Sequence, residues 1–223
     1  GRAAGDVRYE PFIRKRVSHV RGRLTVVNGG NRRDNRCTRS TTWLIGALRT
    51  MIENVWGMDI DERDGDGGDE QDEASAPITH AFNTCGVTAL CLDLIAVGID
   101  DDLQAECVKL CTCMLFKEGG AKKVQKTMFD HLNGTNSELF FRQMKVSIQK
   151  VISWHKWNGV VILEEDEDPD LPEAFRVIRF LQLMSEGHFE PNQDIVREQP
   201  NNPNSYNLLD DMVIMANTLS RLP

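Results

Sequence analysis

Apolar residues recur every three or four positions along most of this chain, and no other feature restricts its fold as much. Phe140, Met144, Ile148 and Ile152 give the clearest case. In an α-helix, residues at this spacing share one face, whereas a β-strand places every second residue on one face. The sequence therefore predicts about seven helices and almost no strand. We expect an all-α fold, either an armadillo-like α-solenoid or an irregular helical bundle.

Capping and breaking residues indicate where these helices begin and end. The hydroxyl side chains at 40–42, one of the aspartates at 100–102 and Ser205 suit helix N-termini, because their oxygens accept hydrogen bonds from free backbone N–H groups. Pro172 suits a first helical turn, where its missing N–H costs nothing. The predicted helices cover residues 40–56, 84–97, 103–116, 124–132, 137–157, 173–189 and 206–222.

Charge is distributed unevenly and divides the chain into three blocks. Residues 1–50 hold 12 Lys and Arg against three Asp and Glu, although the whole chain has a formal net charge of −8. We expect a basic N-terminal arm or loop region over residues 1–39. A helical domain with an acidic insertion at 59–73 then covers residues 40–163, and a further helical segment covers 164–223.

The basic arm has two interpretations. Its Arg-rich stretch, residues 28–39, is typical of a solvated segment, and this is the interpretation we favour. The alternative is a dock for phosphates or for an acidic protein surface. Residues 22–27 are predicted to form a short strand. Because the arm has few aromatic residues and no recognisable reading motif, we expect no nucleic acid as a partner.

The acidic insertion contains the sequence ERDGDGGDEQDE, which nearly fits a calcium-binding loop. Asp64, Asp66 and Glu73 stand at three of the ligand positions of such a loop. However, Asp69 stands where a calcium loop carries an apolar residue, and Pro77 interrupts the helix that should follow. We therefore predict a surface loop and assign it no metal.

Most of the six cysteines lie in apolar, helix-like sequence. This usage is typical of reduced thiols buried in a core. A zinc site is the alternative, since Cys107 and Cys111 are one helical turn apart, but Cys113 points away from them and no CxxC motif is present. We predict no metal and no cofactor. The five cysteines in apolar sequence are Cys85, Cys91, Cys107, Cys111 and Cys113.

The sequence offers no arrangement of side chains that supports an enzyme. His80, His131 and His155 have no Asp, Cys or Ser partner at catalytic spacing. Glu186 and His188 stand at a predicted helix end, where a histidine stabilises the helix dipole and its ring bonds exposed carbonyls. We therefore assign no catalytic, cofactor-binding or metal-binding residue.

Three motifs follow one another between residues 86 and 145: GVTALCLDLIA, CVKLCTCMLFKEGGAKKVQKTMFDHL and SELFFRQMKVSIQ. They resemble a helix, a helix-turn-helix and a further helix of the inositol trisphosphate receptors, a family of intracellular calcium-release channels. Ala121 stands where the family has Asn. The matching residues are Leu92, Asp93, Leu94, Ile95, Leu110, Leu115, Gly119, Gly120, Val124, Gln125, Ser137, Glu138, Phe140, Phe141 and Gln149.

A longer motif lies between residues 175 and 210, FRVIRFLQLMSEGHFEPNQDIVREQPNNPNSYNLL. It resembles a segment shared by the inositol trisphosphate receptors and the ryanodine receptors. Phe189 stands where the family has Asn. The matching residues are Arg179, Phe180, Leu181, Gln182, Leu183, Glu186, His188, Gln193, Arg197, Gln199, Asn202, Tyr206 and Asn207.

The resemblance implies an α-helical, armadillo-like cytosolic scaffold between ligand-binding domains and a membrane pore. Such a scaffold transmits conformational change, and its partners are other domains and subunits of the same, tetrameric channel. The implied location is the cytosolic face of an intracellular calcium-store membrane, the endoplasmic reticulum or an equivalent. The family's ligand site belongs to domains outside this sequence.

The alternative is a free-standing armadillo-like adaptor that binds peptides or acidic partners through its concave face or its Arg-rich arm. The chain begins at Gly1 rather than Met and shows no signal peptide, so we expect a fragment of a longer protein. Because no run of about 18 apolar residues is present, we expect that this part is not embedded in a membrane.

Overall fold

A computed structural model of the chain describes residues 10–27, 35–56, 69–116, 121–134, 137–158 and 170–220. The described residues form helices and the turns between them, with no strand, which confirms the predicted all-α fold class. Their helices are α1 (Glu10–Val27), α2 (Asn35–Trp56), α3 (Asp69–Thr84), α4 (Val87–Val97), α5 (Asp101–Leu115), α6 (Lys122–Leu132), α7 (Glu138–Asn158), α8 (Asp170–Ser185), α9 (Glu190–Arg197) and α10 (Leu208–Leu219).

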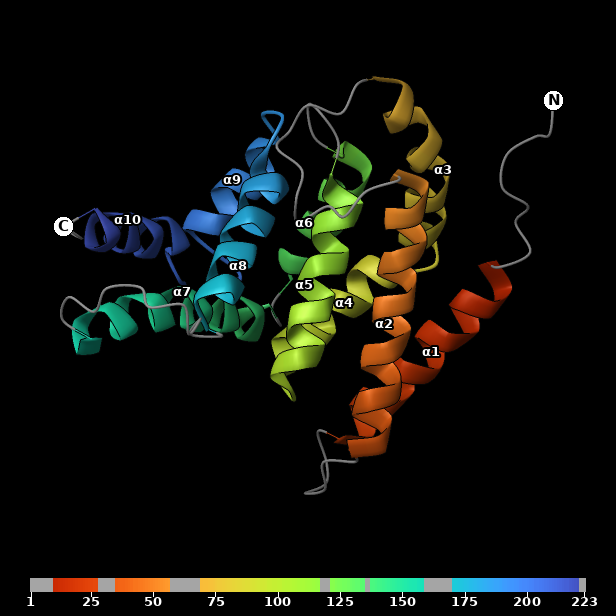
Figure 1. Cartoon of the computed structure of the whole chain (residues 1–223), viewed down its shortest axis with the longest axis horizontal. Coiled ribbons are helices and arrows are strands. Elements are labelled where there is room, and N and C mark those ends of the chain that lie inside the picture. The colour runs from red at the N-terminus through yellow and green to blue at the C-terminus, as the bar shows by residue number, and fades with distance from the viewer. Residues whose placement is uncertain are drawn as a thin grey trace.

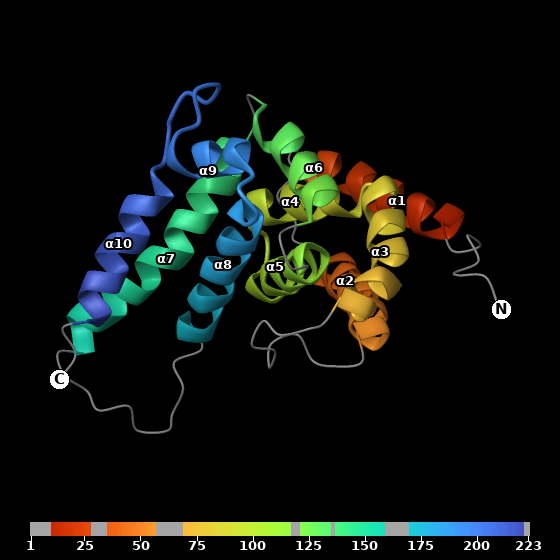
Figure 2. The ribbon, with the colours of Figure 1, turned by 90° about the horizontal axis from the view of Figure 1, so that it is seen from above.

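The helices pack as an irregular bundle in which neighbours follow one another from one end to the other. α2 packs on α5, α5 on α8, α8 on α7, and α7 on α10. α4 lies against α5, α6 and α7, and α9 joins α6, α8 and α10. The N-terminal helices α1–α3 therefore lie at one end of the molecule, and α7 and α10 lie at the other (Figure 1, Figure 2).

The core is continuous along this row of helices, and aromatic rings mark its centre. Phe140 of α7 meets Phe180 of α8 edge to face, with ring centroids 6.3 Å apart, and both rings are buried. The apolar circumference of α8 predicts a helix enclosed by others. The structure confirms this, because α8 contacts α5, α7 and α9. Phe175 of this helix is exposed over 49% of its surface.

Two of the predicted caps can be compared with the structure. Asp100 caps α5, and its carboxylate accepts a hydrogen bond from Leu103 N at 3.0 Å, as the sequence predicts. The cap of α10 is Asn207, whose side chain accepts from Asp210 N at 3.2 Å, so the prediction of Ser205 is wrong. Ser205 is held elsewhere, because its hydroxyl accepts a hydrogen bond from Gln199 N.

The N-terminal block contains more helix than the sequence predicts. Residues 22–27 continue α1 and do not form a strand, and α2 begins at Asn35 rather than at residues 40–42. Ile13, Val17 and Val20 are buried. They follow the same spacing of three and four residues as the helices that the sequence predicts, so packing of this stripe stabilises α1.

The acidic insertion is also partly helical. Residues 69–73 begin α3, so the prediction of a loop is wrong there, while residues 59–68 lie outside the described part. Pro77 lies inside this helix, where a missing backbone hydrogen bond costs about 3 kcal/mol. The part of α3 after Pro77 packs into the core through Phe82, which is 1% exposed, and this burial offsets the cost.

The cysteines of the core are reduced thiols, as their sequence context predicts. All five that lie in apolar sequence are buried and form no disulfide. Burial raises the pKa of the Cys107 thiol well above its ordinary value, so this thiol stays protonated. Within the described part of the chain, no group of three His, Cys, Asp or Glu residues is placed to hold a metal ion.

No single described helix is long and apolar enough to cross a membrane. Residues 77–84 and 87–97 are together long and apolar enough, but a bend of 61° separates the two segments.

Candidate functional site

A network of side-chain hydrogen bonds lies where α6 and the start of α7 meet α8, α9 and the loop before α10. We call it the amide seam and define it by Gln125, Ser137, Asn192, Gln199 and Asn202. Gln125, Asn192 and Gln199 are at most 2% exposed. A buried side-chain amide is costly unless its groups are paired, so each of these residues needs partners supplied by the fold.

The first part of the seam closes the C-terminus of α8. The last carbonyls of a helix have no partner within the helix. Gln125 Nε2 donates to Leu183 O at 3.1 Å and to Glu186 O at 2.9 Å. Asn192 Nδ2 donates to Met184 O at 2.8 Å and to Gln125 O at 3.2 Å. Residues from α6 and α9 therefore satisfy the end of α8 and bind the three helices together.

The turn after α8 changes the interpretation of His188. Gly187 and His188 have φ angles of +67° and +56°, and this left-handed backbone ends the helix. The ring of His188 is predicted to bond the exposed carbonyls of this helix end. The structure places amide donors on those carbonyls instead, including Gln193 Nε2 on Ser185 O at 3.0 Å. His188 itself is exposed, so that part of its predicted role is wrong.

The second part of the seam fixes the loop that contains Pro200 and Pro203. Gln199 Nε2 donates to Ile195 O and to Tyr206 O, the latter at 3.0 Å. Gln199 Oε1 accepts from Tyr206 N at 2.6 Å. One buried side chain therefore joins both ends of the loop. The loop lies at the surface, but Gln199 fixes its backbone at both ends.

The third part of the seam attaches this loop to the turn between α6 and α7. Asn201 Nδ2 donates to Asn133 O at 2.8 Å, and Asn204 Nδ2 donates to Glu138 Oε1 at 2.6 Å. Between them, the Asn202 amide and the Ser137 hydroxyl are hydrogen-bonded at 3.0 Å. Three asparagines from one loop thus hold the end of α6 and the start of α7, some 65 residues earlier in the chain.

A buried carboxylate continues the contact between α7 and α10. Asp211 is 5% exposed, and its Oδ1 accepts from Gln149 Nε2 at 3.0 Å. Lys145 Nζ lies 3.3 Å from Asp211 Oδ2 and 5.9 Å from the centre of the Tyr206 ring. A buried charge needs both a counter-charge and a hydrogen bond, and α7 supplies both.

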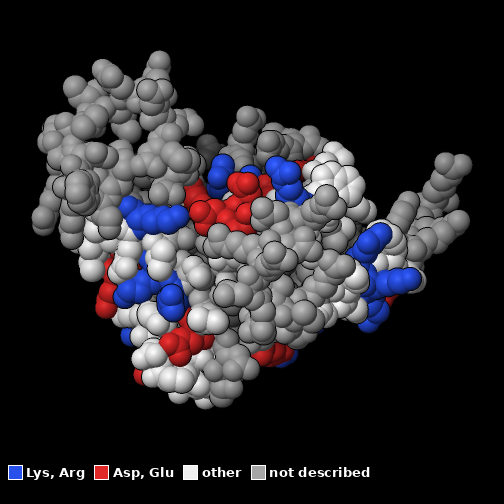
Figure 3. Space-filling view, turned by 90° about the horizontal axis from the view of Figure 1, so that it is seen from below, with Lys and Arg blue, Asp and Glu red and all other residues white. Residues whose placement is uncertain are grey.

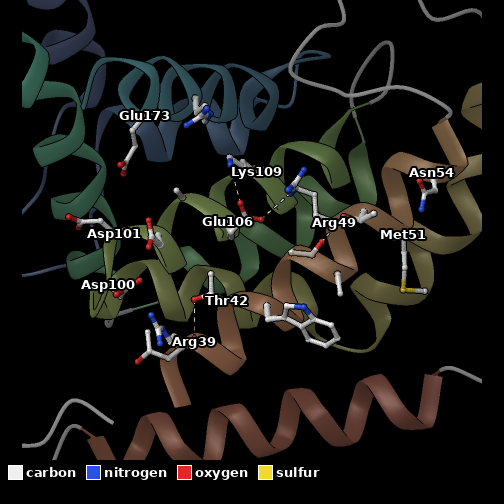
Figure 4. Close-up of a pocket in the computed structure, with 18 residues that line it drawn as sticks. Arg39, Thr42, Arg49, Met51, Asn54, Asp100, Asp101, Glu106, Lys109 and Glu173 are labelled. Atoms are coloured by element: carbon white, nitrogen blue, oxygen red, sulfur yellow. Dashed lines mark hydrogen bonds and ion pairs between the residues drawn. The ribbon is translucent and has the colours of Figure 1, made fainter. Parts of the chain in front are cut away.

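A groove of about 1400 Å³ lies at the other side of α8, between α2, α5 and α8 (Figure 4). Arg49 Nε lies 3.1 Å from Glu106 Oε2, and Lys109 Nζ lies 3.0 Å from Glu106 Oε1. Arg49 is also paired with Glu53. Figure 3 shows acidic side chains near the middle of this side of the molecule, with basic side chains on both sides of them. Since both signs of charge line the groove, it does not select for an anion or for a cation.

The pKa of Glu106 reflects this pairing. Burial raises the pKa, but the hydrogen bond from Lys109 and the positive charge of Arg49 outweigh burial, so the pKa is lowered from its ordinary value. A carboxyl group whose folded-state pKa is lowered contributes stability above its unfolded-state pKa of about 4.3. That contribution is lost as the pH falls through the lower folded-state value.

We therefore expect Glu106→Gln to lower the free energy of unfolding by about 1–2 kcal/mol at neutral pH, because Arg49 and Lys109 lose a charged partner. The difference from the wild type should be smaller at about pH 3 than at neutral pH, because part of this contribution is lost there. Urea denaturation at both pH values measures it. Glu198→Gln, at an exposed position after α9, is the control. An undiminished difference at the acidic pH would contradict this account.

The structure brings together a His–Asp pair that residue spacing in the sequence does not predict. His131 Nε2 lies 2.8 Å from Asp93 Oδ1, and Arg21 Nε lies 3.4 Å from Asp93 Oδ2. The pair joins α6 to α4 and α1, through residues 38 positions apart that no spacing rule connects. Because each of these side chains is bound to another helix, the arrangement is a link between elements.

All five residues of the amide seam lie within the motifs quoted from the sequence. Gln125 and Ser137 come from the motifs before residue 145, while Gln199 and Asn202 come from the motif after residue 175. Asn192, which completes the end of α8, also lies in this motif beside Gln193, but it is not one of the matching residues. A buried asparagine within an otherwise polar helix offers no periodic signal. The structure thus joins three of the quoted motifs, the last of which is far from the other two in the sequence.

A comparison with known protein families supports the resemblance of the motif between residues 175 and 210. Residues 170–221 match the family model described as RyR and IP3R Homology associated. This match confirms the resemblance predicted between residues 175 and 210. It begins with the first residue of α8 and extends just beyond α10, so it contains the whole C-terminal side of the amide seam. No curated protein matches the chain.

Proposed function

From the match of residues 170–221 to the RyR and IP3R Homology associated family, we propose that this chain is a helical scaffold segment of a ligand-gated intracellular calcium-release channel, similar to the inositol trisphosphate receptors. In this role it couples ligand-binding domains to the pore. Its partners are other domains and subunits of a tetrameric channel, on the cytosolic face of a calcium-store membrane. The chain performs no chemistry of its own.

The coupling part of this proposal is supported by the amide seam. Coupling between distant sites needs stiff elements joined by contacts that hold them in register. α8, α9 and α10 form one such unit, and Gln125 and Ser137 connect it to the helices before it. A displacement of α6 and α7 is therefore passed to the C-terminal helices through directional hydrogen bonds, which do not slide as apolar contacts do.

A free-standing helical adaptor is the second candidate. It would use the same fold to bind a peptide, without a pore in the same polypeptide. Reading the coding sequence on both sides of this segment separates the two. The channel proposal expects a long open reading frame with ligand-binding domains before this segment and pore helices after it. A short, complete gene would exclude the channel and favour the adaptor.

The coupling role is tested in the intact channel with a variant that weakens the amide seam. We expect Asn202→Ala to reduce calcium release several-fold at saturating inositol trisphosphate, while binding of that ligand persists. The physical reason is that the loop before α10 loses its tie to Ser137. Calcium flux from permeabilised cells and equilibrium ligand binding provide the two measurements. Gln182→Ala, on the exposed side of α8, is the control. Unchanged release in both variants would refute the coupling role.

A further inference from the structure

An apolar groove with basic edges runs between α1 and α2. It has a volume of about 890 Å³. Ile13 and Val20 of α1 and Leu48 of α2 are buried at its floor. Two large apolar side chains stand at its edge, Trp43 with 76% of its surface exposed and Phe12 with 54%. Trp43 is the most exposed of the large apolar side chains in the described part of the chain.

The charge of the groove is of one sign. Arg16, His19 and Arg39 line it and are exposed, and the described lining residues include no Asp or Glu. The guanidinium of Arg16 lies 5.2 Å from the centre of the Phe12 ring, a cation–π distance that keeps the charge at the edge. Basic side chains also gather on the α1 side of the molecule in Figure 3, at its right. The whole chain, in contrast, carries a net charge of −8.

We propose that this groove binds an acidic amphipathic helix of a partner protein, which inserts apolar side chains between α1 and α2 and places its carboxylates against Arg16 and Arg39. Helix-in-groove binding requires an apolar floor for residues spaced three and four apart, and an edge of opposite charge to orient them. Exposed Trp and Arg residues are the types that contribute most to binding energy at protein interfaces.

The shape of the site favours a helix over an anionic membrane surface. The apolar floor, Ile13, Val20 and Leu48, is buried below the edge of the groove, where the flat surface of a bilayer does not reach. A partner helix presents a narrow row of apolar side chains, which can enter a groove between two helices. This inference goes beyond the proposed function and does not depend on it, because the groove is formed by helices outside residues 170–221.

The test is fluorescence anisotropy with a labelled helical peptide of about five turns, with Leu and Phe on one face and Glu on the flanking positions. We expect saturable binding to the protein that weakens as salt is added. A peptide with Lys in place of Glu should bind at least about tenfold more weakly. Trp43→Ala and Arg39→Glu should each weaken binding of the acidic peptide about tenfold or more.

Two variants away from the groove serve as matched controls. Phe175→Ala removes an exposed aromatic ring of α8, and Lys122→Glu reverses an exposed charge at the start of α6. Both should leave peptide binding unchanged, and circular dichroism checks that every variant is folded. No binding of the acidic peptide, equal loss in the controls, or binding only to phosphatidylserine vesicles would overturn the proposal. Its failure would leave the channel proposal unaffected, since that proposal is tested by calcium release.

Discussion

Replacing Gln125 by alanine should lower the free energy of unfolding by about 2–3 kcal/mol. The substitution removes both hydrogen bonds that Gln125 Nε2 donates to Leu183 O and Glu186 O at the end of α8. Gln125 is fully buried, so water does not replace the lost donor without a change in packing. A buried carbonyl left without a partner costs about 1–3 kcal/mol. Urea denaturation followed by circular dichroism measures the change.

Gln182→Ala provides the matched control for this experiment. Gln182 lies on α8, is exposed, and accepts a hydrogen bond from Arg179 on the same exposed side. Surface substitutions of this kind change stability by at most about 0.5 kcal/mol. If Gln125→Ala proved as mild as Gln182→Ala, the C-terminus of α8 would not depend on α6, and the amide seam would lose its structural role.

The largest loss of stability should follow Phe140→Ala, about 3–5 kcal/mol. Phe140 is 1% exposed and contacts Phe141 and Phe180 edge to face, with centroid distances of 5.2 Å and 6.3 Å. Alanine leaves a cavity between α7 and α8, and helices cannot move together to fill it without breaking the amide seam beside it. The free energy of unfolding in urea is again the quantity to compare.

A control and a double-mutant cycle make this prediction specific. Phe175→Ala, at an exposed ring of α8, should cost less than about 0.5 kcal/mol. Combining Phe140→Ala with Phe180→Ala should give an interaction energy of about 0.5–1.5 kcal/mol, because an edge-to-face pair adds to the burial of each ring. Strictly additive losses would mean that the two rings do not depend on each other, contrary to their packing.

The helices predicted from the sequence are those whose signals lie within one segment. The stripe through Phe140 and Ile152 predicts α7, and the aspartates at 100–102 predict the start of α5. α3 was not predicted, because Pro77 and the acidic residues before it disfavour a helix. Burial of Phe82 in the tertiary structure stabilises the helix nevertheless. Tertiary packing overrides local propensity in this way wherever a segment contributes side chains to a shared core.

The candidate site could be predicted only in part. The motifs contain Gln125, Ser137, Gln199 and Asn202, but nothing in their spacing says that these residues meet. Gln125 reaches across 61 residues to Glu186 O, and Asn202 reaches across 65 to Ser137. The groove between α1 and α2 could not be predicted at all, because its α1 side consists of residues before position 21 and no helix was predicted before residue 40.

The sequence by itself determined that this protein is helical, where most of its helices lie and which faces they bury. Those properties depend on periodicity and capping within a few residues, which a sequence displays directly. Only the tertiary structure decided which helices are neighbours, which amides close the end of α8 and where Trp43 stands beside a basic groove. Each of these depends on residues far apart in the chain that the fold brings together, and such pairs leave no periodic trace in the order of residues.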